Sequence, residues 1–226
     1  MKPVTIKNAL IVTPDEVKKQ DLLIKNGKIA DIGPACTNCG NCIENCPFDA
    51  IEKIDDGDVI DGEGMYLMAG FIDTHVHGVY GVAFDDPAAE FDDALNYEAS
   101  HGVTTLAATT GTQEGYNLCA AFEHIASEAK RRTRGTKIAG IHAEGPCVSP
   151  ARKGAMNEKC MIKPSAEVIR KFCSHADGMM KIITIAPELE GALEAAEEAV
   201  RLGVKPSMGH TDATAPEALT AIEHGF

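Results

Sequence analysis

The second part of the chain alternates apolar, strand-like runs with helical stretches, and this alternation constrains the fold more than any other feature. We expect strands near residues 70–74, 103–109, 137–143, 181–186 and 204–208. We expect helices near residues 88–100, 114–132, 165–176, 190–202 and 215–224. Because alternating strands and helices are typical of crossovers between parallel strands, the sequence predicts an α/β fold with a parallel sheet and covering helices.

Five such βα units occur within residues 70–226, whereas a closed (β/α)8 TIM-type barrel has eight units and about 250 residues. We therefore expect residues 70–226 to form an incomplete TIM-type barrel. Five strands alone would leave open sheet edges and an uncovered apolar interior, so we also expect these 226 residues to belong to a longer product.

Residues 1–69 have a different pattern of short β-rich runs, separated by Pro14 and by Asn26-Gly27, which is a strong hairpin signal. Strand-like residues return at 58–62 and 65–68. We expect residues 4–32 to form a small antiparallel β unit within a small β-sandwich-like domain over residues 1–69, which is interrupted by a cysteine-rich insert at 35–52.

The insert contains Cys36, Cys39, Cys42 and Cys46 in the C-x2-C-x2-C-x3-C-P run of bacterial ferredoxins, which favours a [4Fe–4S] cluster. In two-cluster ferredoxins the fourth cysteine ligates the other cluster, and only one run is present here. A single cluster would need Cys46 to fold back, a remote thiol such as Cys119, or a second subunit. A structural zinc site on the same thiolates and a loop of free thiols are the alternatives.

The charge balance and the apolar runs exclude several classes of partner. The formal net charge is -13, and no Lys/Arg-rich run marks a nucleic-acid footprint. The start has no apolar stretch long enough for a signal peptide, and no apolar run approaches the roughly 20 residues of a membrane span. We expect a cytoplasmic protein that has neither nucleic acid nor a membrane as its partner.

Candidate metal ligands follow three of the expected strands. His75 and His77 are two residues apart, so in an extended strand both imidazoles share a face. Glu144 ends the third strand just before Gly145-Pro146, and His210 follows the fifth. A carboxylate there is costly to bury unless it is paired or bound to metal. Taken singly, each could be an ordinary strand-end or loop residue, but together they lie where such barrels place their active sites.

Several segments resemble the amidohydrolase superfamily and, within it, the family of deacetylases that act on N-acetylglucosamine 6-phosphate. They are Gly70-Phe71-Ile72-Asp73-Thr74-His75-Val76-His77-Gly78, His142-Ala143-Glu144-Gly145-Pro146, Lys153-Gly154-Ala155, Ile185-Ala186-Pro187-Glu188 and Gly209-His210-Thr211-Asp212-Ala213-Thr214. The resemblance implies that Glu144 and His210 bind the main divalent ion (Zn, Fe, Mn or Co) and that His75 and His77 hold a second ion in binuclear members.

The resemblance also implies that the loop at Ala155 and Met156 touches the sugar phosphate and that the full-length form is a homodimer. The family usually has His where this chain has Met156, and its catalytic Asp and a further metal-binding His would lie beyond Phe226. The implied reaction hydrolyses the acetamide to glucosamine 6-phosphate and acetate, and we expect little or none of it from these 226 residues alone. The alternatives are an iron–sulfur redox or sensing module on this scaffold and an amidohydrolase that acts on a cyclic amide.

Overall fold

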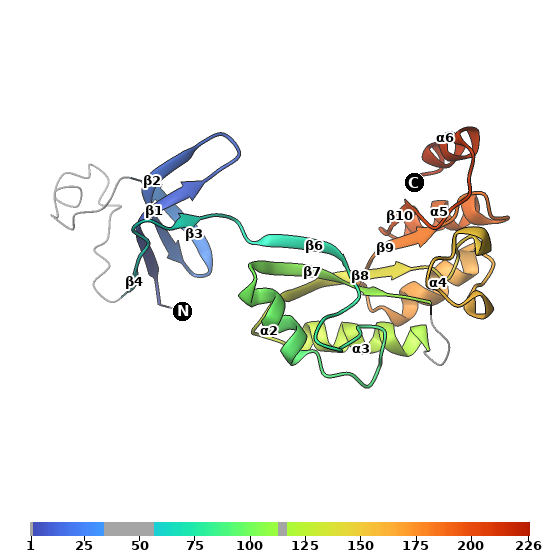
Figure 1. The fold of residues 1–226 in the computed structure, drawn as a ribbon, viewed down its shortest axis with the longest axis horizontal. Coiled ribbons are helices and arrows are strands. Elements are labelled where there is room, and N and C mark those ends of the chain that lie inside the picture. Colours follow the sequence, from blue (N-terminus) through green and yellow to red (C-terminus); the bar gives the residue numbers. More distant parts are fainter. Residues whose placement is uncertain (1, 34–56, 113–116) are drawn as a thin grey trace. The chain divides into compact units, whose positions relative to one another are not determined.

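The computed structural model describes residues 2–33, 57–112 and 117–226. The chain divides into two compact units, Met1–Ala69 and Gly70–Phe226, and Figure 1 shows a β-sheet in each. The four cysteines of the insert lie outside the described residues.

The first unit is a five-stranded sheet in the order β3-β2-β1-β4, with β5 also paired to β1. Its strands are β1 (Val4–Val12), β2 (Val17–Lys25), β3 (Lys28–Gly33), β4 (Asp58–Asp61) and β5 (Tyr66–Leu67). The predicted hairpin is confirmed, because β2 and β3 pair antiparallel around Asn26 and Gly27. Both turn residues have positive φ, 54° and 71°, as a type I′ turn requires.

The antiparallel unit expected over residues 4–32 is confirmed by the pairing of β1, β2 and β3, whereas β4 and β5, for which no direction was predicted, run differently. Both pair parallel to β1, with Val4 opposite Asp58 and Leu10 opposite Tyr66. A two-residue hairpin forces antiparallel pairing, whereas the chain reaches β4 through a long connection that permits either direction. Turn residues therefore predict the direction of β3 relative to β2 but not that of β4.

The second unit is a parallel sheet in the order β10-β9-β8-β7-β6. Its strands are β6 (Phe71–Val76), β7 (Val103–Thr110), β8 (Lys137–Glu144), β9 (Met180–Ile185) and β10 (Lys205–Met208). Each strand lies beside its neighbour in the sequence, as successive βα units of a barrel do. The predicted incomplete barrel with five parallel strands is confirmed.

The helices of the second unit are α2 (Asp92–Ser100), α3 (Leu118–Arg131), α4 (Ala166–His175), α5 (Ala192–Arg201) and α6 (Ala215–Glu223). Figure 1 shows α2 and α3 along one face of the sheet. The helix expected from residue 88 begins at Asp92 instead, because Asp86 accepts the backbone N–H of Ala88 and holds a turn there. Where α3 begins, Asn117 accepts the N–H groups of Cys119 and Ala120.

The core of this unit lies between the strands and the helices. Its largest fully buried side chains are Phe84, Phe91, Phe122, Leu95, Leu106, Ile125, Ile141, Ile169, Ile183, Ile185 and Val148. Truncating such a side chain to Ala costs about 2–5 kcal/mol, because a cavity adds to the lost burial. This packing fixes the position of each strand along its own axis relative to its neighbours. It therefore also fixes the positions of the residues at the strand ends. In the described ranges, no helix has the length and apolar character that a membrane span requires.

A carboxylate on α5 ties the two neighbouring helices together. Glu198, whose side chain is 10% exposed, accepts hydrogen bonds from Arg201 on its own helix at 2.5 and 2.8 Å and from Arg170 on α4 at 3.1 Å. The Arg201 bond, followed by that of Arg170, lowers the pKa of Glu198 to about 2. Because the folded state holds this carboxylate ionised, the pairing stabilises the fold at neutral pH.

We predict that Glu198→Gln lowers the midpoint of urea unfolding at pH 7. The pKa of Glu198 is about 2 in the folded chain against an ordinary 4.5, so its contribution is present above pH 4.5 and is lost as the pH falls toward 2. The difference between variant and wild type should shrink over that window. Glu223→Gln, at an exposed position on α6, is the control. A difference independent of pH would contradict this reading.

Candidate metal centre

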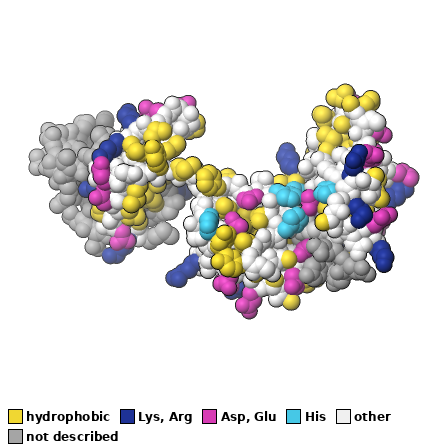
Figure 2. Space-filling model, in the orientation of Figure 1, with side chains coloured by type: hydrophobic (Ala, Val, Ile, Leu, Met, Phe, Trp, Pro, Cys, Tyr) yellow, Lys and Arg dark blue, Asp and Glu magenta, His cyan; other side chains and the backbone are white. Residues whose placement is uncertain are grey.

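The proposed ligands meet at the carboxyl ends of three strands. His75 lies near the end of β6 with His77 just beyond it, Glu144 is the last residue of β8, and His210 lies two residues after β10. Figure 2 shows histidine side chains gathered at one place on the surface of the second unit. The chain thus brings together residues that are up to 135 positions apart (210 − 75).

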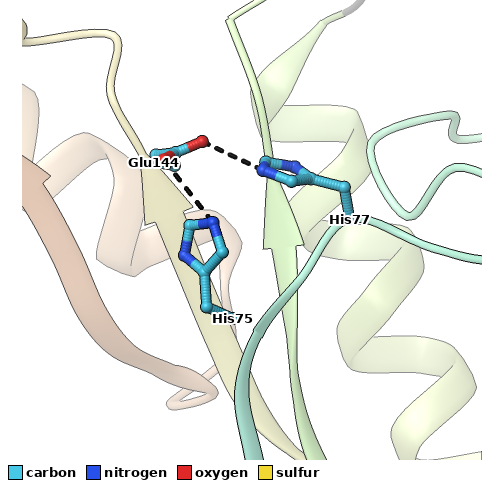
Figure 3. A group of neighbouring side chains, drawn as sticks. All are labelled: His75, His77 and Glu144. Carbon is cyan, nitrogen blue, oxygen red and sulfur yellow. Dashed lines mark ion pairs between the residues drawn. The ribbon is translucent and has the colours of Figure 1, made fainter. Parts of the chain in front are cut away.

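The carboxylate of Glu144 lies at the centre of the group. Its Oε2 is 3.0 Å from Nε2 of His77, and its Oε1 is 3.5 Å from Nε2 of His75 and 3.1 Å from Nε2 of His210. Figure 3 shows His75 and His77 approaching it from one side of the strand end. Its side chain is 14% exposed, whereas those of His75 and His77 are nearly half exposed, so the group is open to solvent on the imidazole side.

Backbone carbonyls orient two of the imidazoles. His210 donates from Nδ1 to the carbonyl of Arg152 at 2.9 Å, and His77 donates to the carbonyl of Thr109. A carbonyl can only accept, so the ring nitrogen that faces it carries a proton, and Nε2, which here donates to Glu144, is the nitrogen that would offer its lone pair to a cation after losing its proton. In both rings Nε2 faces Glu144, and a backbone carbonyl that also accepts from the ring and orients it is typical of metal-binding histidines.

The carboxylate and the imidazoles of the group stabilise one another's charged forms. The hydrogen bond from His77, followed by that from His210, outweighs burial and lowers the pKa of Glu144 to about 2. The Glu144 carboxylate in turn raises the pKa of His77. An ionised carboxylate surrounded by imidazoles therefore persists throughout the neutral range, and this is the protonation state that a cation would need from Glu144.

His142 supports the group and is not one of the ligand candidates. Its Nδ1 donates to the carbonyl of Thr74 at 3.0 Å, so in the neutral ring Nε2 accepts from the hydroxyl of Thr184 at 2.9 Å. Burial lowers the pKa of His142, although the Thr74 bond opposes this. Its ring meets that of His75 edge-on, with centroids 4.9 Å apart. His142 thus packs against His75 with both of its nitrogens occupied.

The expected substrate loop lies next to the group. Ala155 is exposed, whereas Met156 is only 7% exposed. A Cβ added to Gly145 would lie 3.4 Å from the Met156 sulfur, so Met156 packs against the turn that follows Glu144. The backbone N–H of Asn157 bonds to the carbonyl of Thr112, and this bond ties the end of the loop to the end of β7.

Sequence reasoning assigned no role to two carboxylates near the group. Asp85 is 4% exposed and accepts the N–H of Gly111, and its charge contributes to the raised pKa of His77. Glu188 accepts from the hydroxyl of Thr211 and the N–H of Asp212, immediately after His210. The sequence signal for Glu188 is its position: it comes shortly after an apolar strand and Pro187, much as Glu144 comes at the end of β8. Asp85 lies in a loop without such a signal.

The donor set fits a divalent cation. One ligand atom each from His75, His77 and Glu144 lies within 4.8 Å of the others, and His210 approaches the same carboxylate oxygen as His75. Imidazole nitrogen with carboxylate oxygen suits zinc and its first-row neighbours. Binding would require Nε2 of His77 and of His210 to release the proton that each now donates to Glu144.

The amidohydrolase family model matches residues 66–225, and the model of the 4Fe-4S binding domain matches residues 35–52. The first match covers more than half of the chain and agrees with the fold and with the strand-end group. The chain belongs to the amidohydrolase family.

Among curated proteins, N-acetylglucosamine-6-phosphate deacetylase of Bacillus subtilis is 33% identical over 215 residues, which are 92% of this chain and 50% of that protein. The deacetylase structure from Pasteurella multocida has a TM-score of 0.81 at 26% identity, over 99% of this chain and 55% of that one. The Mycobacterium smegmatis enzyme, in complex with N-acetyl-D-glucosamine-6-phosphate, has a TM-score of 0.76 at 27% identity, over 99% and 53%. The chain spans about half the length of the curated relatives it matches.

We predict that the chain binds Co²⁺ or Zn²⁺ and that Glu144→Ala or His210→Ala weakens binding at least tenfold, because each removes one of the donor groups proposed to hold the ion. Isothermal titration of the metal-free chain, with the visible d–d bands of Co²⁺ as a second readout, measures this. His175→Ala, on the outer helix α4 where His175 pairs with Glu123, is the matched control. Equal affinities in all four proteins would exclude the site.

Proposed function

We propose that this site hydrolyses the acetamide of N-acetylglucosamine 6-phosphate to acetate and glucosamine 6-phosphate. The observation that supports it most is the carboxylate of Glu144 shared by three imidazoles at the strand ends of an amidohydrolase barrel. The relatives that match along nearly the whole of this chain are named for the same reaction. Glu144 and His210 would hold the principal ion, with His75 and His77 available to a second.

Each of these residues has a defined task in the reaction. Glu144 contributes negative charge and remains ionised at neutral pH, since its pKa is about 2. The Arg152 carbonyl orients His210 and the backbone of Thr109 orients His77, so that Nε2 of each ring faces Glu144, where it would meet an ion after releasing its proton. A bound divalent ion supplies Lewis-acid polarisation of a carbonyl and lowers the pKa of bound water from 15.7 to about 7.

The loop after β8 is the proposed contact for the sugar phosphate. Ala155 is exposed beside the group, and the neighbouring Gly154 lies close to His210, because a Cβ there would be 3.4 Å from Cε1 of that ring. Met156, buried against Gly145, would meet substrate with an apolar thioether and no N–H donor. We propose that Ala155 and Met156 shape the wall of the sugar site and that phosphate binding relies on other groups.

The test measures acetate release from N-acetylglucosamine 6-phosphate by the protein as its gene encodes it. Glu144→Ala and His210→Ala should each lower kcat/KM by at least 100-fold, because both remove ligands of the ion on which the reaction depends. His175→Ala should leave it unchanged. A cyclic amide such as hydantoin serves as the comparison substrate for the alternative amidohydrolase reaction. Acetate release that survives both ligand variants, or faster turnover of the cyclic amide, would overturn the proposal.

We further propose that the insert holds a [4Fe–4S] cluster through Cys36, Cys39, Cys42 and Cys46. The spacing of the four cysteines and the match of the 4Fe-4S binding domain to residues 35–52 support this. Zinc bound by the same thiolates remains the alternative. The soft thiolates select iron–sulfur or zinc, so this centre would be chemically distinct from the imidazole and carboxylate group.

Anaerobic purification should yield brown protein with the broad visible absorbance of sulfur-to-iron charge transfer and with acid-labile sulfide. Cys39→Ser should abolish the colour, because serine cannot supply the thiolate. Cys160→Ser, at a free cysteine of the second unit, should retain it. Colourless wild-type protein that contains stoichiometric zinc would decide for the zinc alternative.

A further inference from the structure

The backbone of His210 is held in an unfavourable conformation. Its φ is 50°, in the left-handed region, which non-glycine residues seldom occupy. Such a backbone conformation is strained for a residue with a side chain and persists only where its surroundings impose it. The contacts of His210 and its neighbours therefore show what holds the imidazole in place.

One set of contacts comes from the loop after β8. The N–H of Ser149 donates to the carbonyl of His210 at 2.9 Å, and the carbonyl of Arg152 accepts from Nδ1 of the ring at 2.9 Å. The loop thus holds both the backbone and the ring of His210. An ion pair between Arg152 and Asp212 at 2.7 Å joins the same two segments, but both side chains are more than half exposed, so it contributes little to stability.

The second set of contacts comes from one carboxylate after β9. Glu188 accepts from the hydroxyl of Thr211 at 2.5 Å with one oxygen and from the N–H of Asp212 at 2.8 Å with the other. It also accepts from the hydroxyl of Ser149, a residue only 5% exposed. Bonds to an ionised acceptor are about twice as strong as neutral ones. Glu188 therefore joins the two residues after His210 to the loop that holds His210 itself.

We propose that Glu188 is a positioning residue, which holds residues 210–212 and Ser149 together so that the strained backbone of His210 directs its Nε2 to Glu144. The oxygens of Glu188 accept hydrogen bonds from two hydroxyl groups and one backbone N–H. Glu188 therefore acts through His210 and not as a metal ligand. This inference rests on the metal centre proposed above. Helix α5 begins at Ala192, shortly after Glu188, so the carboxylate is carried by a segment that leads directly into a helix.

The test compares Glu188→Ala with Glu190→Ala in the whole chain. Glu190 is two residues away, and its side chain is 86% exposed in an ion pair with Lys163, so its loss controls for charge. Co²⁺ affinity should fall about 10–100-fold in Glu188→Ala and stay unchanged in Glu190→Ala, as is typical when the support of a ligand is removed. Glu188→Gln, which keeps acceptor oxygen but no charge, should lie between them.

A second variant separates positioning from a general loss of structure. Thr211→Val removes one donor to Glu188 at nearly constant shape and should weaken Co²⁺ binding by a smaller factor. The double variant Thr211→Val with Glu188→Ala should bind as Glu188→Ala does, because both changes break one unit. Additive effects would show that the two residues act independently and would overturn the proposal.

A readout without metal distinguishes the failure of this inference from that of the metal centre. Amide hydrogen exchange of segments 149–152 and 209–212 in the metal-free chain should be faster in Glu188→Ala and unchanged in Glu190→Ala. If wild type binds no Co²⁺ but exchange responds in this way, the metal centre fails and the positioning role of Glu188 holds. Unchanged exchange in Glu188→Ala would overturn the inference whether or not metal binds.

Discussion

The parallel pairing of β6 to β10 is the constraint on which the candidate site depends. All five strands end at the same edge of the sheet, so His77, Glu144 and His210 meet although long helices separate them in the sequence. The register matters as much as the direction. His142 lies opposite Thr109 and Ile182, and Glu144 opposite Thr184. A slip of one residue in β8 would turn both side chains to the opposite face and would separate the carboxylate from the imidazoles.

Two carboxylates at this edge differ through the groups that surround them. Glu144 faces imidazole nitrogens, which can exchange a proton for a metal ion and so leave the carboxylate free to ligate. Glu188 faces a hydroxyl and a backbone N–H, which only donate to it and hold it in a fixed position. Each pKa lies below the ordinary value, but only Glu144 is surrounded by groups that themselves bind metal ions. The groups that donate to each carboxylate, and not the carboxylate itself, therefore distinguish a candidate metal ligand from a residue that holds a segment in place.

The same edge has a strained backbone at one of the proposed ligands. His210, two residues after β10, has a left-handed backbone; the loop after β8 bonds to its carbonyl and its ring, and Glu188 bonds to the two residues that follow it. The insert in the first unit offers cysteines in place of imidazole and carboxylate, and the 4Fe-4S binding domain model matches it. One chain therefore carries two groups of residue types that favour different metals.

Much of the architecture could be predicted from the sequence because it depends on local periodicity. The five βα units and the Asn26-Gly27 hairpin follow from apolar spacing and from turn residues that tolerate positive φ. The four candidate ligands were predicted from their positions at strand ends. By contrast, the start of α2 was misplaced because a single side-chain bond of Asp86 decides it.

The sequence by itself determined the class of fold, the family and the residue types available for chemistry, since strand and helix periods are properties of short segments. Only the tertiary structure decided that β4 runs parallel to β1, that His142 supports its neighbour with both nitrogens bonded, and that Glu188 holds the segment after His210. Each of these depends on which distant groups come within hydrogen-bonding distance. That proximity arises from packing, which no local pattern encodes.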